Sequence, residues 1–209
     1  MTTDHLAPIY EVTRGDFTTA GFGPTPSQTV GPYWHIGLLW EDGPDVVSPS
    51  EADRITVAIT VIDGSGQPVT DAMVETWQAD HEGRFPTIPN GGPGGPTTRF
   101  RGFARSGADG TGTARIHTVK PSALPAESGR IEAPHLDVSI FARGMLDRLV
   151  TRMYFPEDTA AHTSDPVLSM LAEHDRPKLI ATRVDDGYSW TVHVQDTDPL
   201  GRETPFFEV

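Results

Sequence analysis

The sequence alternates between aliphatic and smaller side chains over one stretch, Arg54-Ile55-Thr56-Val57-Ala58-Ile59-Thr60-Val61-Ile62. Consecutive side chains of a β-strand point to opposite faces, so the isoleucines and valines at positions 55, 57, 59 and 61 share one face. The opposite face carries threonine and alanine. This alternation predicts a half-buried strand whose aliphatic face packs into a core.

Further strands are predicted on the C-terminal side of this stretch by apolar runs bounded by Gly, Pro and Asp. They cover residues 72–78, 99–105, 113–119, 135–143, 149–155, 179–184 and 188–194. The turn Asp185-Asp186-Gly187 predicts that the last two form a hairpin. One helix is predicted near residues 165–174, with Ser164 as its N-cap. About eight short strands with one short helix predict an all-β fold, a β-sandwich.

The region before the first strand has no regular period. Residues 1–24 are interpreted as an extended N-terminal arm, and residues 25–209 as a single sandwich domain. Residues 25–37 contain two prolines and are predicted to lie across another surface as extended chain, because proline disfavours helix. The Gly- and Pro-rich residues 86–96 are predicted to be an irregular loop.

Composition excludes several kinds of site and partner. The net charge of −13 comes from 29 acidic and 16 basic residues, and such a field repels the phosphates of nucleic acids and anionic membranes. Because the chain has no cysteine, disulfides, zinc-thiolate sites, iron–sulfur clusters and thiol catalysis are excluded. The first residues lack the features of a signal peptide, and no apolar run approaches the ~20 residues of a membrane span. We therefore expect a cytoplasmic protein without nucleic-acid or membrane partners.

Polar groups with chemical potential concentrate on the predicted strand 135–143. One of its faces is aliphatic and is predicted to enter the core: Leu136, Val138 and Ile140. The other face is polar and carries His135, Asp137, Ser139 and Arg143. This polar face either lines a pocket or is a solvated sheet face, and the pattern alone does not decide between the two.

A His-x-Asp pair also fits one kind of metal site. In a two-histidine, one-carboxylate triad, His135 and Asp137 would be joined by His193. Arg202 would then hold the carboxylate of a co-substrate, an arrangement that resembles the ferrous 2-oxoglutarate-dependent oxygenases. The sequence contains no Gly-x-Ser-x-Gly nucleophile motif and no phosphate-binding glycine loop.

Six segments, which follow one another in order from residue 25, resemble the protocatechuate 3,4-dioxygenases. These are intradiol ring-cleaving enzymes built from paired α and β subunits. The segments are Thr25-Pro26-Ser27-Gln28-Thr29-Val30-Gly31-Pro32-Tyr33, Glu75-Thr76-Trp77-Gln78-Ala79-Asp80, His117-Thr118-Val119-Lys120-Pro121, Ala133-Pro134-His135, Phe141-Ala142-Arg143-Gly144 and Thr151-Arg152-Met153-Tyr154-Phe155. The resemblance implies a β-sandwich and covers nearly the whole chain except residues 1–24.

The resemblance also implies a ferric ion, Fe(III), held by two tyrosines and two histidines. The two tyrosine positions are occupied here by Phe85 and Leu124, and the histidine pair by His135 and Asp137. An arginine that precedes the pair in the family is here Glu132. With one ligand of four retained, the chain resembles the iron-free α subunits. The resemblance thus implies that Fe(III) is bound by a partner β subunit and not by this chain.

Family α subunits still contribute to a substrate pocket at the contact with β. On this resemblance the substrate-binding residues are Thr29, Gly31, Pro32, Tyr33 and Arg143, the arginine facing the substrate carboxylate. The implied reaction is intradiol cleavage of 3,4-dihydroxybenzoate with O2 to 3-carboxy-cis,cis-muconate.

Each of these roles has a structural alternative. Tyr33 can be an ordinary interface aromatic, Arg143 a structural ion pair, and His135 a relic that is hydrogen-bonded within a degenerate site. For the chain as a whole, the alternatives are a non-enzymatic β-sandwich binding module and the ferrous oxygenase described above.

Overall fold

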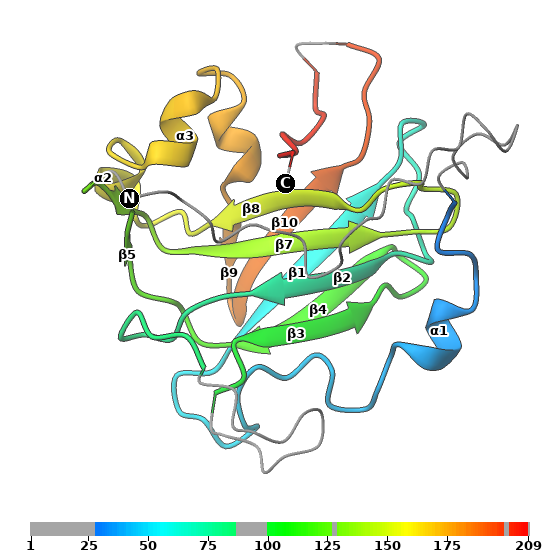
Figure 1. The fold of residues 1–209 in the computed structure, drawn as a ribbon, viewed down its shortest axis with the longest axis horizontal. Coiled ribbons are helices and arrows are strands. Elements are labelled where there is room, and N and C mark those ends of the chain that lie inside the picture. The colour runs from blue at the N-terminus through cyan, green and yellow to red at the C-terminus, as the bar shows by residue number, and fades with distance from the viewer. Residues whose placement is uncertain (1–27, 87–99, 127–128, 199–200, 209) are drawn as a thin grey trace, which may run out of the picture.

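Two four-stranded β-sheets pack face to face in the computed structural model, which describes residues 28–86, 100–126, 129–198 and 201–208 (Figure 1). One sheet has the order β4 (Thr113–Thr118), β1 (Ile55–Ile62), β10 (Gly187–His193) and β9 (Thr182–Val184). The other has the order β3 (Phe103–Gly107), β2 (Met73–Trp77), β7 (His135–Phe141) and β8 (Leu149–Tyr154). A small pair, β5 (Leu124–Pro125) and β6 (Ile131–Glu132), stands beside them.

The core lies between the two sheets, as the alternation of the sequence predicted. The valines and isoleucine at positions 57, 59 and 61 of β1 are fully buried, and so are the aliphatic residues at positions 136, 138 and 140 of β7. These two faces belong to one continuous apolar cluster. The prediction of an all-β sandwich is therefore confirmed.

The first and the last strand of the described chain are neighbours in the first sheet, where β1 pairs in parallel with β10. Gly187 begins β10 with φ of 147°, and a Cβ at this position would lie 2.0 Å from the carbonyl oxygen of Thr56. Only glycine fits so close an approach of two backbones. The predicted hairpin of the last two strands is confirmed, although β9 spans only Thr182–Val184.

Several expectations from the sequence are wrong in detail. Residues 34–37 form a one-turn helix, α1 (Trp34–Gly37), rather than extended chain, because both prolines precede the turn and no helical N–H is lost. The predicted strand 179–184 begins too early, because Leu179 is the last residue of the 3-10 helix η1 (Arg176–Leu179). The arm of residues 1–24 and most of the loop 86–96 lie outside the described residues.

The predicted helix near residue 165 is shorter than expected and has a different N-cap. It divides into α3 (Pro166–Met170) and an irregular segment, and α2 (Thr159–His162) precedes it. Asp165 is the N-cap, since its side chain accepts a hydrogen bond from the Leu168 N–H at 2.8 Å. Ser164 instead donates its hydroxyl to the carbonyl of Ala161. Among the described residues, no helix combines the length and the apolar character that a membrane crossing requires.

Candidate functional site

The residues singled out in the sequence gather at the two opposite ends of β7. His135 begins this strand and Arg143 follows its end, and the seven residues of β7 span about 20 Å. Figure 1 shows β7 between β2 and β8, with α1 beyond its C-terminal end and the β5 segment beyond its start. The chain therefore has two candidate sites rather than one.

At the first end, an arginine joins two carboxylates. Arg152 of β8 lies directly opposite Asp137 of β7, and its Nε is 2.9 Å from Asp137 Oδ1. Its Nη1 is 2.9 Å from Oε2 of Glu132, which comes from β6. The side chains of Arg152 and Glu132 are 19% and 20% exposed and that of Asp137 is 41% exposed, so this ion cluster is partly screened from solvent and links the three strands.

His135 lies buried beside this ion cluster. Its Nδ1 is 2.7 Å from the carbonyl oxygen of Ala133 and donates to it, and its Nε2 is 3.6 Å from Glu132 Oε2 and 3.8 Å from Asp137 Oδ1. Burial, and then the Arg152 charge, lower the pKa of His135. The ring is therefore neutral and structural in this environment, in keeping with its interpretation as a relic.

Shared neighbours connect the four positions at which the family resemblance implies iron ligands: Trp77 lies between Phe85 and Asp137, and Glu132 between Leu124 and His135. Phe85 stacks on Trp77 at a centroid distance of 5.7 Å, and Trp77 pairs in register with Asp137. Leu124 is the strand partner of Glu132. The loop before Phe85 approaches Leu124, because a Cβ added to Gly83 would lie 3.6 Å from Leu124 Cδ2.

The residues present do not fit a ferric ion. Phe85 and Leu124 have no ligating atom, and the carboxylate of Asp137 is already bound by a guanidinium. Across the parts of the chain that the structure describes, no group of three or more His, Asp or Glu side chains is arranged to hold a metal ion.

The ferrous triad weighed in the sequence is wrong. His193 ends β10 in the sheet opposite to β7, so it does not approach the pair His135 and Asp137. Arg202 points its Nε toward Asp196 Oδ2 at 3.5 Å. The sequence shows only that these residue types are present, whereas the fold places His135 and Asp137 in one sheet and His193 in the other.

At the second end of β7, the N-terminal segment lies against the turn after the strand. The Gly144 N–H donates to Thr29 Oγ1 at 2.8 Å, and the Gly31 N–H lies 3.5 Å from the same oxygen. Pro32 and Tyr33 are exposed, Tyr33 by 77%. A small hollow of about 230 Å³ lies here, lined by Val30, Phe141, Ala142, Met145, Leu146, Asp147 and Arg148.

Arg143 presents its guanidinium at this same end. Its side chain is 66% exposed, and its Nε lies 3.3 Å from Asp71 Oδ2. The structure thus places Thr29 against Gly144, the residue after Arg143 in this turn, and Gly31, Pro32 and Tyr33 follow Thr29 along the chain. An exposed guanidinium is suited to bind a planar carboxylate once another surface covers it.

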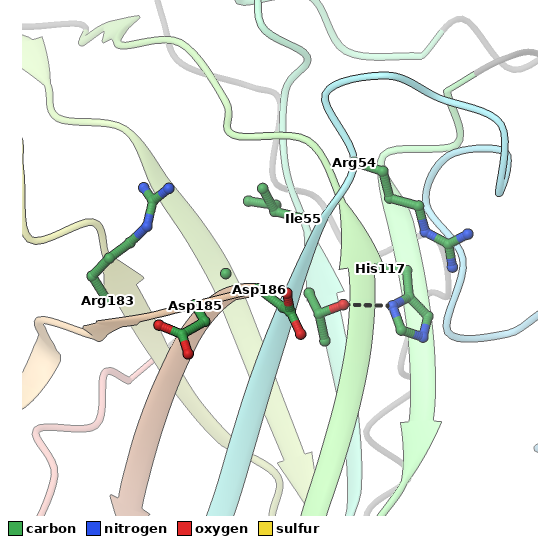
Figure 2. A pocket seen from close by; sticks show the side chains of 8 residues that line it. Arg54, Ile55, His117, Arg183, Asp185 and Asp186 are labelled. Atoms are coloured by element: carbon green, nitrogen blue, oxygen red, sulfur yellow. Dashed lines mark hydrogen bonds between the residues drawn. The ribbon is translucent and has the colours of Figure 1, made fainter.

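A larger hollow that sequence reasoning missed lies at the start of β1, and Figure 2 shows it with Arg54 and His117 on one side and Arg183 on the other. It is an open depression of about 570 Å³. Arg54 is paired with Asp45 at 2.6 Å, and Arg183 donates to the Tyr188 hydroxyl at 2.7 Å. Because both guanidinium groups have partners and two acidic residues line the hollow, it is not arranged to capture an anion.

His117 in this hollow gives a prediction about pH. Partial burial, and then the nearby Arg54 charge, lower its pKa below the ordinary value of about 6.5. The folded state therefore binds fewer protons than the unfolded state, so the free energy of unfolding falls as pH drops below about 6.5. His117→Gln, which keeps an acceptor for the Thr56 hydroxyl, is expected to make this fall shallower. Urea unfolding between about pH 7 and 5.5 measures it, and identical slopes for the two proteins would contradict the prediction.

Comparison with known proteins supplies a context for this geometry. A family model described as "Dioxygenase" matches residues 45–189. The protocatechuate 3,4-dioxygenase alpha chain of Burkholderia cepacia is 36% identical over 202 residues, which cover 88% of this chain and 97% of that protein. The beta chain of the same enzyme and organism is 34% identical over 140 residues, covering 62% of this chain and 55% of that protein. The crystal structure of catechol 1,2-dioxygenase from Pseudomonas arvilla C-1 shares the fold, with a TM-score of 0.53 and 18% identity over 74% of this chain and 57% of that one.

Proposed function

The chain belongs to the dioxygenase family, and we propose that within this iron-dependent family it is the iron-free α subunit of a protocatechuate 3,4-dioxygenase. In this role it completes the substrate pocket at the contact with a β subunit that binds Fe(III). The reaction is intradiol cleavage of 3,4-dihydroxybenzoate with O2, which gives 3-carboxy-cis,cis-muconate. Residues 25–209 form the dioxygenase domain, residues 1–24 are an N-terminal extension, and the enzyme is cytoplasmic.

One observation carries this proposal: the metal position of the family is filled here by groups that do not bind a metal. Phe85 is stacked on Trp77, and Arg152 links the carboxylates of Asp137 and Glu132. A chain that keeps the dioxygenase fold but lacks the ligands depends on another chain for its chemistry. The match to both an alpha and a beta chain supports a hetero-oligomer as the form in which that chemistry is supplied.

The contribution of this chain would come from the other end of β7. There the hydrogen bond between Gly144 and Thr29 fixes the segment that carries Gly31, Pro32 and Tyr33 against the turn of Arg143. The planar guanidinium of Arg143 offers parallel N–H groups to the carboxylate of 3,4-dihydroxybenzoate. Arg143 and this segment would orient the substrate, while the ferric ion of the β subunit would supply the redox chemistry.

Exposed apolar side chains next to this end support an interface. They are Val30, Tyr33, Ile36, Leu38 and Trp40, which are between 40% and 80% exposed and lie within eleven residues of one another. Large apolar side chains gathered on one surface are typical of a site that another protein covers. Permanent interfaces of this kind often bury more than ~2,000 Å².

Co-expression with the β subunit tests the proposal. We expect the complex to contain a single ferric ion per αβ pair, a visible tyrosinate-to-iron absorption band and ring-cleaving activity. The chain purified alone is expected to bind no iron, to cleave no catechol and to self-associate through its uncovered apolar surface. Iron analysis, turnover assays and size-exclusion chromatography measure these properties.

Two results would contradict the proposal. Stoichiometric iron with dioxygenase activity in the isolated chain would show that it needs no partner for its chemistry. A well-behaved monomer that does not bind the β subunit would instead favour the non-enzymatic binding module.

A further inference from the structure

The partly buried ion cluster at the start of β7 contains a cation of its own. Arg152 Nε contacts Asp137 Oδ1 and Arg152 Nη1 contacts Glu132 Oε2, both at 2.9 Å. The three residues come from β8, β7 and β6, so one guanidinium connects three strands. Arginine remains charged under all ordinary conditions, so the positive charge is a permanent part of the fold.

The guanidinium is bound directly to a residue that stands at one of the implied ligand positions. Asp137 occupies the place of the second histidine ligand in the resemblance, and its Oδ1 lies 3.8 Å from Nε2 of His135, the retained ligand position. A metal held by nitrogen ligands lies about 2.1 Å from each of them. An ion bound by side chains at positions 135 and 137 would therefore lie within a few ångströms of the guanidinium.

We propose that Arg152 is a built-in cation that takes the place of the metal and keeps the position closed to iron. It neutralises the two carboxylates and ties β6, β7 and β8 together, as a metal ion ties its ligands. The missing tyrosines alone then do not explain an iron-free chain, because restoring all the ligands would still leave a positive charge in the site. This inference rests on the proposed function, since the ligand positions come from that family.

Like charges a few ångströms apart repel each other, and the partial burial of Arg152 weakens the screening of this repulsion by water. Ferric ion carries three positive charges, and the arginine cannot lose its proton to relieve the repulsion. The repulsion could be relieved only if the guanidinium moved away. Glu132, which remains when Asp137 is replaced by histidine, still binds the guanidinium and opposes this movement. The closed state is therefore the stable one even when ligands are offered.

The test restores the ligands with and without Arg152 in the co-purified αβ complex. The three-ligand variant is Phe85→Tyr, Leu124→Tyr and Asp137→His, and the four-substitution variant adds Arg152→Gln. We expect one ferric ion per αβ pair in the wild-type complex and in the three-ligand variant, and two in the four-substitution variant. A second tyrosinate-to-iron band should accompany the second ion.

Each other result overturns the inference. A second iron in the three-ligand variant would show that Arg152 does not keep the position closed, and no second iron in either variant would show that its removal does not open it. The wild-type complex is the control for the proposed function, because a complex without its single iron would contradict that proposal and not the role of Arg152.

A second measurement covers the case in which the reconstructed variants fail to assemble. Arg152→Gln alone leaves two partly buried carboxylates without a cation and is expected to lower the unfolding temperature of the complex by several degrees. Adding Glu132→Gln and Asp137→Asn removes both negative charges and is expected to recover most of that loss. If the neutral variant unfolds no later than Arg152→Gln alone, the guanidinium does not act as the neutralising cation.

Discussion

Replacing Arg143 by alanine in the αβ complex is expected to lower kcat/KM for 3,4-dihydroxybenzoate by roughly 10- to 150-fold. A charge-assisted hydrogen bond contributes about 1.5–3 kcal/mol, and each ~1.4 kcal/mol corresponds to a factor of ten. The lost binding energy should be the same for the bound substrate and for the transition state, because the carboxylate does not react. The effect should therefore appear mainly as a higher KM. Iron content is expected to stay unchanged, since the proposed metal site is on the partner chain.

Two controls separate substrate binding from a purely structural role for Arg143. Catechol has no carboxylate, so its weaker turnover should change far less than that of 3,4-dihydroxybenzoate. Among the described residues, Arg143 forms an ion pair only with Asp71, whose Oδ2 lies 3.3 Å from Arg143 Nε, and Asp71→Asn removes the charge of this partner. If Arg143 binds substrate, this variant should retain its activity. An equal drop for both substrates, or the same loss in Asp71→Asn, would mean that Arg143 holds the structure instead.

The sequence predicted those parts of the fold that depend on a single strand. Strict alternation in β1 and in β7 reports burial directly, because the side-chain period of a strand is two residues, and the buried faces of both strands were predicted correctly. The parallel pairing of β1 with β10 could not be predicted, because it joins residues more than 120 positions apart. Its only local sign was Gly187, which reads equally well as part of a turn.

The candidate site shows the same division between local and long-range information. The absence of a ligating atom at Phe85 and Leu124 is visible in the sequence, and the structure adds that the loop before Phe85 approaches Leu124 at Gly83. The role of Arg152 was missed, although it stands in one of the segments that carry the resemblance. It becomes visible only when the register of β7 and β8 places it opposite Asp137 and the short β6 brings Glu132 to its other side.

The choice of N-cap for α3 was wrong for a related reason. Ser164 and Asp165 are both good capping residues, and sequence alone does not distinguish neighbours of this kind. Asp165 is fully buried and serves three donors at once, whereas Ser164 is exposed. Asp165 Oδ1 accepts from the Leu168 N–H at 2.8 Å and from the Tyr154 hydroxyl at 3.2 Å, and Asp165 Oδ2 accepts from the Ala133 N–H at 2.8 Å. One carboxylate thus connects α3 with β8 and with the short segment between β6 and β7.

Asp165→Ala is therefore expected to lower the free energy of unfolding by about 3–5 kcal/mol. The substitution removes the helix cap and leaves two backbone N–H groups and the Tyr154 hydroxyl buried without an acceptor, and each such group costs roughly 1–3 kcal/mol. Tyr154 cannot adapt by ionising, because burial, and then the neighbouring Asp165 charge, raise its pKa. Release of the buried charge offsets only part of this cost, since the carboxylate is well hydrogen-bonded.

Asp165→Asn and Ser164→Ala are the matched variants for this prediction. Asparagine keeps the shape but turns an amide donor toward either Leu168 or Ala133, so an intermediate loss is expected. Ser164→Ala, one residue away, should change the unfolding free energy by less than about 0.5 kcal/mol, because the hydroxyl it removes is exposed and the Ala161 carbonyl can accept from water instead. Urea unfolding of the three variants and the wild type gives the comparison. Equal effects of Ser164→Ala and Asp165→Ala would contradict the prediction, whereas a dominant loss at Asp165 would show that its buried carboxylate holds α3 against β8 and the segment before β7.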